Sequence, residues 1–127
     1  MKTIAVACLL AFSLAAGARA GAPIYQPTDL VDVKLSAPDM EGRAIEVHGF
    51  LFDVAGIWSI ERGRGTGPRI YLDMTDVPKA QMRDLILDCT NQFCSAVLRG
   101  TVHLIEPWAT DEAWGIVVES ATEGPSG

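Results

Sequence analysis

Two segments of the chain alternate apolar and polar side chains with a period of two, which predicts β-strands. In the first, residues 43–54 (RAIEVHGFLFDV), every second residue from position 45 to position 51 is apolar or glycine. The second, residues 96–106 (AVLRGTVHLIE), has the same layout, and its predicted inward face continues to Leu104. Each segment carries a glycine on its apolar face, Gly49 or Gly100, and such a glycine marks a bulge or a sharp bend.

Three shorter segments also have the composition of strands. They are residues 57–61 (IWSIE), 69–74 (RIYLDM) and 115–121 (GIVVESA). The glycine-rich residues 62–68 (RGRGTGP) join the first two, so we expect a hairpin with a long tip.

A helix is predicted between the hairpin and the second long strand, in residues 75–89 (TDVPKAQMRDLILDC). Its apolar residues Val77, Met82, Leu85 and Ile86 recur at helical spacing and predict one buried side. Thr75 or Asp76 is the expected N-cap, with Pro78 in the first turn.

The order of three strands, a helix and two strands predicts an all-β domain with one helix. It is the layout of a five-stranded Greek-key barrel, the OB-fold, and we assign residues 43–121 to that domain. Residues 21–42 are expected to form an N-terminal arm and turn, in which Thr28 caps a short turn or helix. Residues 122–127 (TEGPSG) are expected to be a disordered tail.

The N-terminal residues 1–20 have the pattern of a secretory signal peptide. Lys2 precedes an apolar run at residues 4–16, and Ala18-Arg19-Ala20 fits a small-x-small cleavage site. The run is shorter than the ~20 apolar residues that span a bilayer, so we expect export to a periplasmic or secreted location and no membrane span. Cleavage after Ala20 also removes Cys8, which leaves Cys89 and Cys94.

The charge of the remaining chain is strongly acidic. Without residues 1–20 it has 8 Lys and Arg against 16 Asp and Glu, a net charge near −8. Such a chain repels phosphate backbones, so the charge argues against nucleic acid as a partner.

Several of these segments together resemble a known group of proteins. EGRAIEVHGFL, WSIE, RIYLD, a helix ending in Cys, CSAVLRGTV and GIVVESA are similar to the small secreted OB-fold proteins of Gram-negative bacteria, in the group of tRNA-anticodon-like and bacterial OB-fold domains. The resemblance covers residues 28–121, and its V-x-G-x-L and L-x-G-x-V motifs describe barrel geometry. It therefore implies a fold and no particular activity.

Cys89 and Cys94, in the stretch DCTNQFCSA, can be a structural disulfide, half of a metal site or a redox pair. Export favours the disulfide. A redox cysteine usually lies at a helix N-terminus, whereas Cys89 lies at the predicted C-terminus. A zinc site needs about four ligands, and His103 is too far along its strand from Cys94. We therefore predict a disulfide that holds the helix to the following strand. Its reduction should loosen the helix and leave the binding face of the hairpin largely in place.

The hairpin and the last loop hold the candidate ligand-binding residues. OB-folds bind ligands on the face of the second and third strands, beside the last inter-strand loop. Aromatic rings beside guanidinium groups suit stacking on a partner. An alternative without binding stays open. In it, Trp58 belongs to the core and the arginines only balance the charge of nearby acidic residues. The candidates are Trp58, Arg62, Arg64, Arg69, Tyr71, Trp108 and Trp114.

These patterns predict a non-catalytic binding module for a protein, peptide or glycan, with no cofactor. The sequence contains no nucleophile elbow. One alternative is single-stranded nucleic-acid binding. Another is metal binding through His48 and His103, which requires the two histidines to meet across neighbouring strands; no metal site is assigned.

Overall fold

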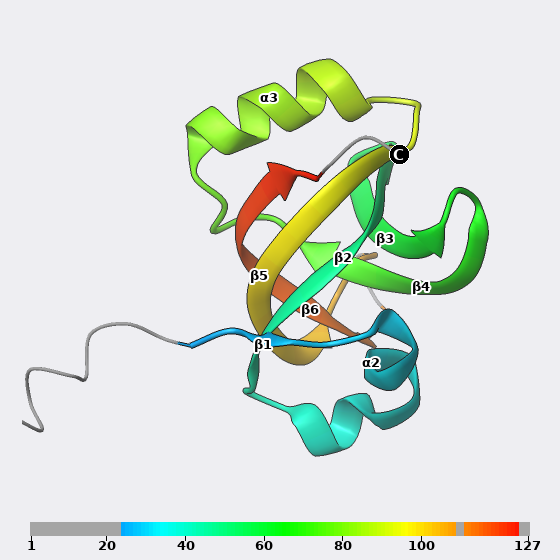
Figure 1. Cartoon of the computed structure of the whole chain (residues 1–127), viewed down its shortest axis with the longest axis vertical. Helices are drawn as coiled ribbons and strands as arrows, with labels where there is room; N and C mark the ends of the chain where they lie inside the picture. The colour runs from blue at the N-terminus through cyan, green and yellow to red at the C-terminus, as the bar shows by residue number, and fades with distance from the viewer. Residues whose placement is uncertain (1–23, 109–110, 125–127) are drawn as a thin grey trace, which may run out of the picture.

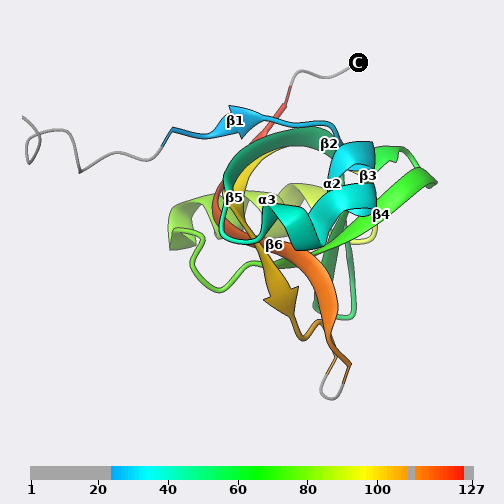
Figure 2. The ribbon, with the colours of Figure 1, turned by 90° about the horizontal axis from the view of Figure 1, so that it is seen from below.

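Five long strands form one sheet that curves round until its members close into a ring. The computed structural model describes residues 24–108 and 111–124. The sheet order is β1-β2-β3-β4-β6-β5, and an additional pairing of β2 with β5 closes the ring (Figures 1 and 2). The strands are β1 (Gln26–Pro27), β2 (Ala44–Val54), β3 (Ile57–Gly63), β4 (Thr66–Asp73), β5 (Cys94–Ile105) and β6 (Ala113–Glu123).

Three helical segments accompany the ring. The helix α2 (Leu30–Ser36) continues into the 3-10 helix η1 (Ala37–Met40), and both lie at one end of the ring, while α3 (Lys79–Cys89) lies at the other (Figure 1). The predicted five strands and one helix were therefore wrong in number, since β1, α2 and η1 add to them. The five long predicted strands and the helix between the third and fourth are confirmed, with shifted ends.

The core fills the ring because alternate residues of each strand point inward. The two helices contribute Leu30 and Val33 at one end and Leu85 and Cys89 at the other. No helix in the described part of the chain is long and apolar enough to cross a membrane. The largest fully buried side chains of the strands are Ile45, Val47, Leu51, Ile60, Leu98, Val102, Ile116 and Val118.

Glycines allow the two longest strands to curve around this core. A β-carbon at Gly100 would collide with the carbonyl oxygen of Val117, and one at Gly49 would lie 2.5 Å from the carbonyl oxygen of Glu61. β2 pairs with β5 up to Leu51 and with β3 from Phe50 onward, so Gly49 lies where the strand passes from one neighbour to the other.

The two predictions about helix caps were wrong. Asp29, and not Thr28, caps α2: its side chain accepts a hydrogen bond from Val31 N at 2.9 Å. Helix α3 begins after Pro78, without a side-chain cap, so neither Thr75 nor Asp76 caps it.

Two apolar residues predicted to point inward are exposed. Ile86 lies on the outer side of α3. At the end of β5, Leu104 is exposed and Ile105 is buried, because Ile105 packs over Gly115 of β6 beyond the closed part of the ring.

The predicted segment ends also change. The hairpin tip is short, because Gly63 pairs with Thr66 and leaves only residues 64–65 in the turn. β6 extends to Glu123, two residues into the predicted tail. The predicted signal peptide, residues 1–20, lies outside the described residues.

The N-terminal segment is fastened to the ring by polar contacts. The Tyr25 hydroxyl donates a hydrogen bond to Glu119 of β6, and this bond raises the pKa of Tyr25 above its ordinary value. Arg99 of β5 lies with its guanidinium carbon 5.8 Å from the centre of the Tyr25 ring. Arg99 also donates to Glu46 of β2 at 2.9 Å and lowers the pKa of that carboxyl.

We predict that Gly100→Ala destabilises the protein by about 3 kcal/mol, the upper part of the range for overpacking, because the new β-carbon meets backbone and not a flexible side chain. Urea denaturation followed by circular dichroism measures the change. The control is Thr122→Ala, an exposed substitution on β6. A loss for Gly100→Ala no larger than that of the control would contradict the tight strand contact.

Candidate functional site

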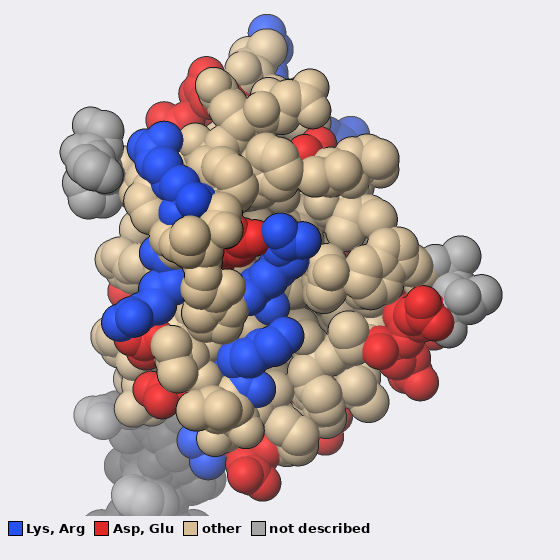
Figure 3. All heavy atoms as spheres, turned by 90° about the vertical axis from the view of Figure 1, so that its right-hand side faces the viewer, with Lys and Arg blue, Asp and Glu red and all other residues tan. Residues whose placement is uncertain are grey.

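The outer surface of β2, β3 and β4 carries the candidate site. The strand register aligns two rows across the three strands: Phe50, Glu61 and Arg69 form one row, and Phe52, Ser59 and Tyr71 form the next. We call this surface, with Arg64, Phe93 and Trp108 beside it, the outer face. Figure 3 looks onto the side of the molecule that bears the β3–β4 hairpin and shows a band of Lys and Arg interrupted by acidic side chains, next to uncharged surface.

Two loops add aromatic rings to the outer face. Phe93, from the segment between α3 and β5, stacks on Phe52 with ring centres 4.4 Å apart and planes at 19°. Trp108, from the segment between β5 and β6, meets Tyr71 edge-on with ring centres 4.6 Å apart. At the hairpin turn, the guanidinium carbon of Arg64 lies 5.0 Å from the centre of the Phe50 ring, a cation–π contact.

A buried ion pair lies under this surface. Glu61 is only 3% exposed, and its Oε1 accepts from Nη2 of Arg69 at 2.6 Å and from Nε at 2.7 Å. The pKa of Arg69 is raised, chiefly by this hydrogen bond. The other carboxylate oxygen, Oε2, is buried and has no hydrogen-bond partner among the described residues. Arg69 is therefore held in one orientation by a carboxylate that solvent does not reach.

A small cavity opens on the outer face beside Arg69. Its volume is about 190 Å³, below the 300–1,000 Å³ that is typical for drug-sized ligands. It is therefore the size of a site for one side chain or a small fragment. The lining residues are Phe52, Val54, Ile57, Ser59, Arg69, Tyr71 and Trp108.

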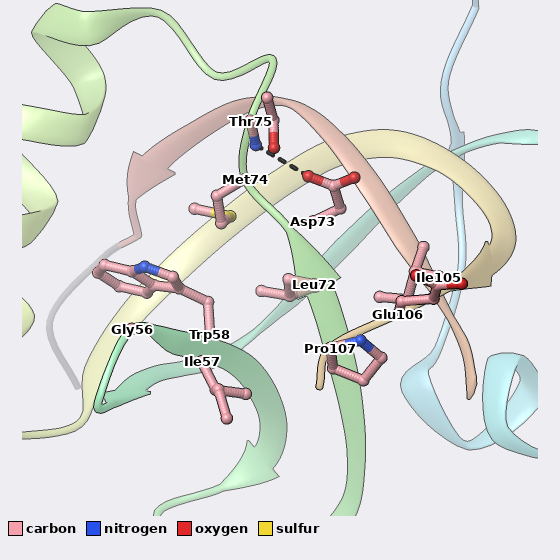
Figure 4. A pocket seen from close by; sticks show the side chains of 10 residues that line it. All are labelled: Gly56, Ile57, Trp58, Leu72, Asp73, Met74, Thr75, Ile105, Glu106 and Pro107. Carbon is pink, nitrogen blue, oxygen red and sulfur yellow. Dashed lines mark hydrogen bonds between the residues drawn. The ribbon is translucent and has the colours of Figure 1, made fainter. Parts of the chain in front are cut away.

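A second, larger cavity of about 400 Å³ lies around the end of β4 (Figure 4). Trp58, Leu72 and Met74 contribute apolar walls, and the Asp73 carboxylate accepts a hydrogen bond from Thr75 N at 3.0 Å (Figure 4). Glu106 adds a second carboxylate. In the described part of the chain no group of three or more His, Cys, Asp or Glu residues is arranged to hold a metal ion, so two carboxylates alone do not make a metal centre here.

The structure brings together four of the seven predicted ligand-binding residues, Arg64, Arg69, Tyr71 and Trp108, through the contacts above. The other three lie elsewhere. Trp58 is buried and lines the second cavity. Arg62 turns to the cap of α2, where it meets Asp29 at 3.4 Å. Trp114 packs against the core from β6.

The two histidines do not meet. His48 pairs with Val97 of β5, and His103 lies six residues further along that strand, which is about 20 Å at ~3.3 Å per residue. His48 instead lies 3.5 Å from Glu46. A metal site shared by His48 and His103 is therefore excluded.

The predicted disulfide is confirmed, and it lies close to the outer face. Cys89 and Cys94 form a disulfide, with their Cα atoms 5.5 Å apart, that joins the last residue of α3 to the first residue of β5. The bridged segment also carries Phe93 onto Phe52. The disulfide therefore lies next to the residue that brings Phe93 onto the outer face. The expectation that reduction leaves this face in place stays a prediction.

Sequence reasoning missed Phe50, Phe52, Phe93 and Glu61 as members of this site. The period-two pattern does contain a signal, because it places two phenylalanines of β2 on the side opposite the core. Phe93 and the burial of Glu61 have no such signal, since both depend on contacts between distant segments.

Comparisons with known proteins support the fold. No protein-family model matches the chain, and no curated protein matches it. Among solved structures, OBody AM3L15 bound to hen egg-white lysozyme is similar, with a TM-score of 0.56 and 14% identity over 84% of this chain and 100% of that chain. OBody AM1L10 bound to hen egg-white lysozyme matches with a TM-score of 0.53 and 14% identity over 83% and 98% of the two chains. At this identity the likeness shows the fold alone, which is OB-fold-like.

We predict that Cys89→Ala/Cys94→Ala lowers the free energy of unfolding by about 2 kcal/mol, the chain-entropy value for so short a loop. It should also weaken the nuclear Overhauser contact between the rings of Phe52 and Phe93, because the segment is no longer closed. The control is Phe93→Ala, which keeps the disulfide and removes only the ring. Unchanged ring contacts in the double variant would contradict the link between the disulfide and the face.

Proposed function

We propose that this protein is a non-catalytic binding module, an OB-fold barrel whose outer face contacts a protein or peptide partner. The observation that carries the proposal is the outer face itself, where aromatic rings from β2, β4 and two loops surround two arginines. Trp108 remains 40% exposed although it is large and apolar. Exposed aromatic and arginine side chains are enriched where proteins bind each other.

Two further points support a protein partner over a nucleic acid. The similar OBody structures are complexes with lysozyme. In this chain the segment that bears Trp108 also contains the acidic residues Glu106, Asp111 and Glu112. A phosphate backbone would meet these charges unfavourably.

The location and the absence of catalysis belong to the same proposal. We expect the chain to be exported and to lose residues 1–20, as in the secreted bacterial OB-fold proteins that it resembles, because its disulfide suits an oxidising compartment. On the outer face the one hydroxyl nucleophile from β3, Ser59, is buried, and both histidines lie on other parts of the sheet. Among the described residues the outer face therefore does not place an accessible hydroxyl nucleophile beside a histidine base, and this favours binding over catalysis of acyl transfer.

We predict that Arg64→Glu weakens capture of the partner from extracts of the producing cells about tenfold or more, without lowering the melting temperature. The reason is that Arg64 is exposed at a turn, with its guanidinium over Phe50, so its reversal changes the surface and not the core. Quantitative affinity capture with mass spectrometry measures the effect.

The control is Arg83→Glu, the same charge reversal at an exposed position on α3, which should leave capture unchanged. Equal capture by both variants and the wild type would overturn the proposal. Tight, salt-dependent binding of a single-stranded oligonucleotide that Arg64→Glu abolishes would replace it with the nucleic-acid alternative.

A further inference from the structure

The small cavity on the outer face has mostly apolar walls and a single charged lining residue. Val54, Ile57 and the aromatic rings of Phe52, Tyr71 and Trp108 supply apolar surface, and Val54 is 55% exposed at its mouth. Arg69 is its one charged lining residue. An apolar group that enters this cavity therefore has a guanidinium beside it.

The geometry of Arg69 leaves part of this guanidinium free for a ligand. Nε and Nη2 both contact one oxygen of Glu61, so the pair uses one edge of the planar group. A guanidinium has five N–H donors, and the Arg69 side chain is 52% exposed. The unused donors can therefore bind an acceptor that arrives from solvent.

Glu61 keeps this arrangement in place. If Arg69 turned away, Glu61 would become an unpaired buried charge, which is strongly destabilising. The carboxylate also cannot serve an incoming cation directly, because it is buried and its Oε2 is covered. Glu61 is thus a positioning residue, and the charge that a ligand meets is that of Arg69.

Neighbouring charges favour a ligand with a single negative charge. Lys34 donates to the carbonyl oxygen of Arg69 at 3.3 Å, and Arg64 lies at the adjoining hairpin turn. On the other side, the segment after β5 contributes exposed acids such as Glu106. One carboxylate next to an apolar group suits this environment better than a chain of phosphates.

We propose that the cavity binds an aromatic or large aliphatic side chain of the partner whose neighbouring carboxylate is held by Arg69. This inference rests on the proposed function and makes it specific, because it names the chemistry that the partner presents. The carboxylate comes either from the C-terminus of a chain or from an Asp or Glu side chain next to the apolar residue.

Small fragments test the proposal without the partner. Three probes share a phenyl group: 3-phenylpropionate, 3-phenylpropanol and phenethylamine. Titrations of the ¹⁵N-labelled protein should show amide shifts in β3 and β4 and a shift of the Trp108 indole. The carboxylate should bind about tenfold more tightly than the alcohol, the gain expected from one charge-assisted hydrogen bond, and the amine should bind most weakly.

Variants of the cavity residues separate their contributions to probe binding. Arg69→Gln should reduce the carboxylate-to-alcohol ratio of affinities to about one, and Trp108→Ala should weaken all three probes. Glu61→Gln should reduce the ratio severalfold while the alcohol binds as before, since only the orientation of Arg69 changes; a purely structural role for Glu61 would weaken all probes alike. Arg83→Glu is again the control.

Peptides then identify the source of the carboxylate. N-acetyl-phenylalanine presents a C-terminal carboxylate, and N-acetyl-Phe-Glu-amide presents one from a side chain; preferential binding of either over N-acetyl-Phe-amide supports the proposal. Equal affinity for acid, alcohol and amine, or shifts that map away from β3 and β4, would overturn it. The proposed function survives that outcome if Arg64→Glu still weakens capture tenfold or more, so the two failures are distinguishable.

Discussion

Closure of the ring depends on a short parallel pairing between β4 and β6. Only Tyr71, Leu72 and Asp73 take part from β4, opposite residues 115–117 of β6. Gly115 makes the close approach possible, because a β-carbon there would lie 2.5 Å from both the Tyr71 carbonyl oxygen and the Ile105 side chain. The same contact brings the segment between β5 and β6 to β4, and so Trp108 reaches Tyr71. The β4–β6 pairing is therefore needed both for the ring and for the candidate site.

The buried pair of Glu61 and Arg69 is the second constraint on this surface. A buried ion pair seldom stabilises a fold more than apolar residues of similar size would, because both charges lose their hydration. Here one partner is buried and the other half-exposed, and the free edge of the guanidinium faces solvent. We infer that the pair orients Arg69 for binding, at the cost of an unsatisfied carboxylate oxygen.

Much of the fold could be predicted from the sequence, because the period-two pattern of β2 and β5 and the helical spacing of α3 reflect burial directly. Contacts between loops and strands could not be predicted. The stacking of Phe93 on Phe52 needs the disulfide and the strand register together. Trp114 lies near Trp108 in the sequence and looks equally suited to a binding surface. In the structure it belongs to β6 and packs against the core. Arg62 follows Glu61 in β3 and therefore points to the opposite side of the strand, where it meets Asp29 at the cap of α2.

The central claim is that the partner binds the outer face. Photo-crosslinking tests it most directly, with a photoreactive residue at Val54, at the mouth of the small cavity, and in a second variant at Leu87, which is 70% exposed on α3. The account predicts one defined crosslinked product from position 54, competed by unlabelled wild-type protein, and none from position 87. Crosslinking of the same partner from position 87 alone, or equally from both positions, would contradict it.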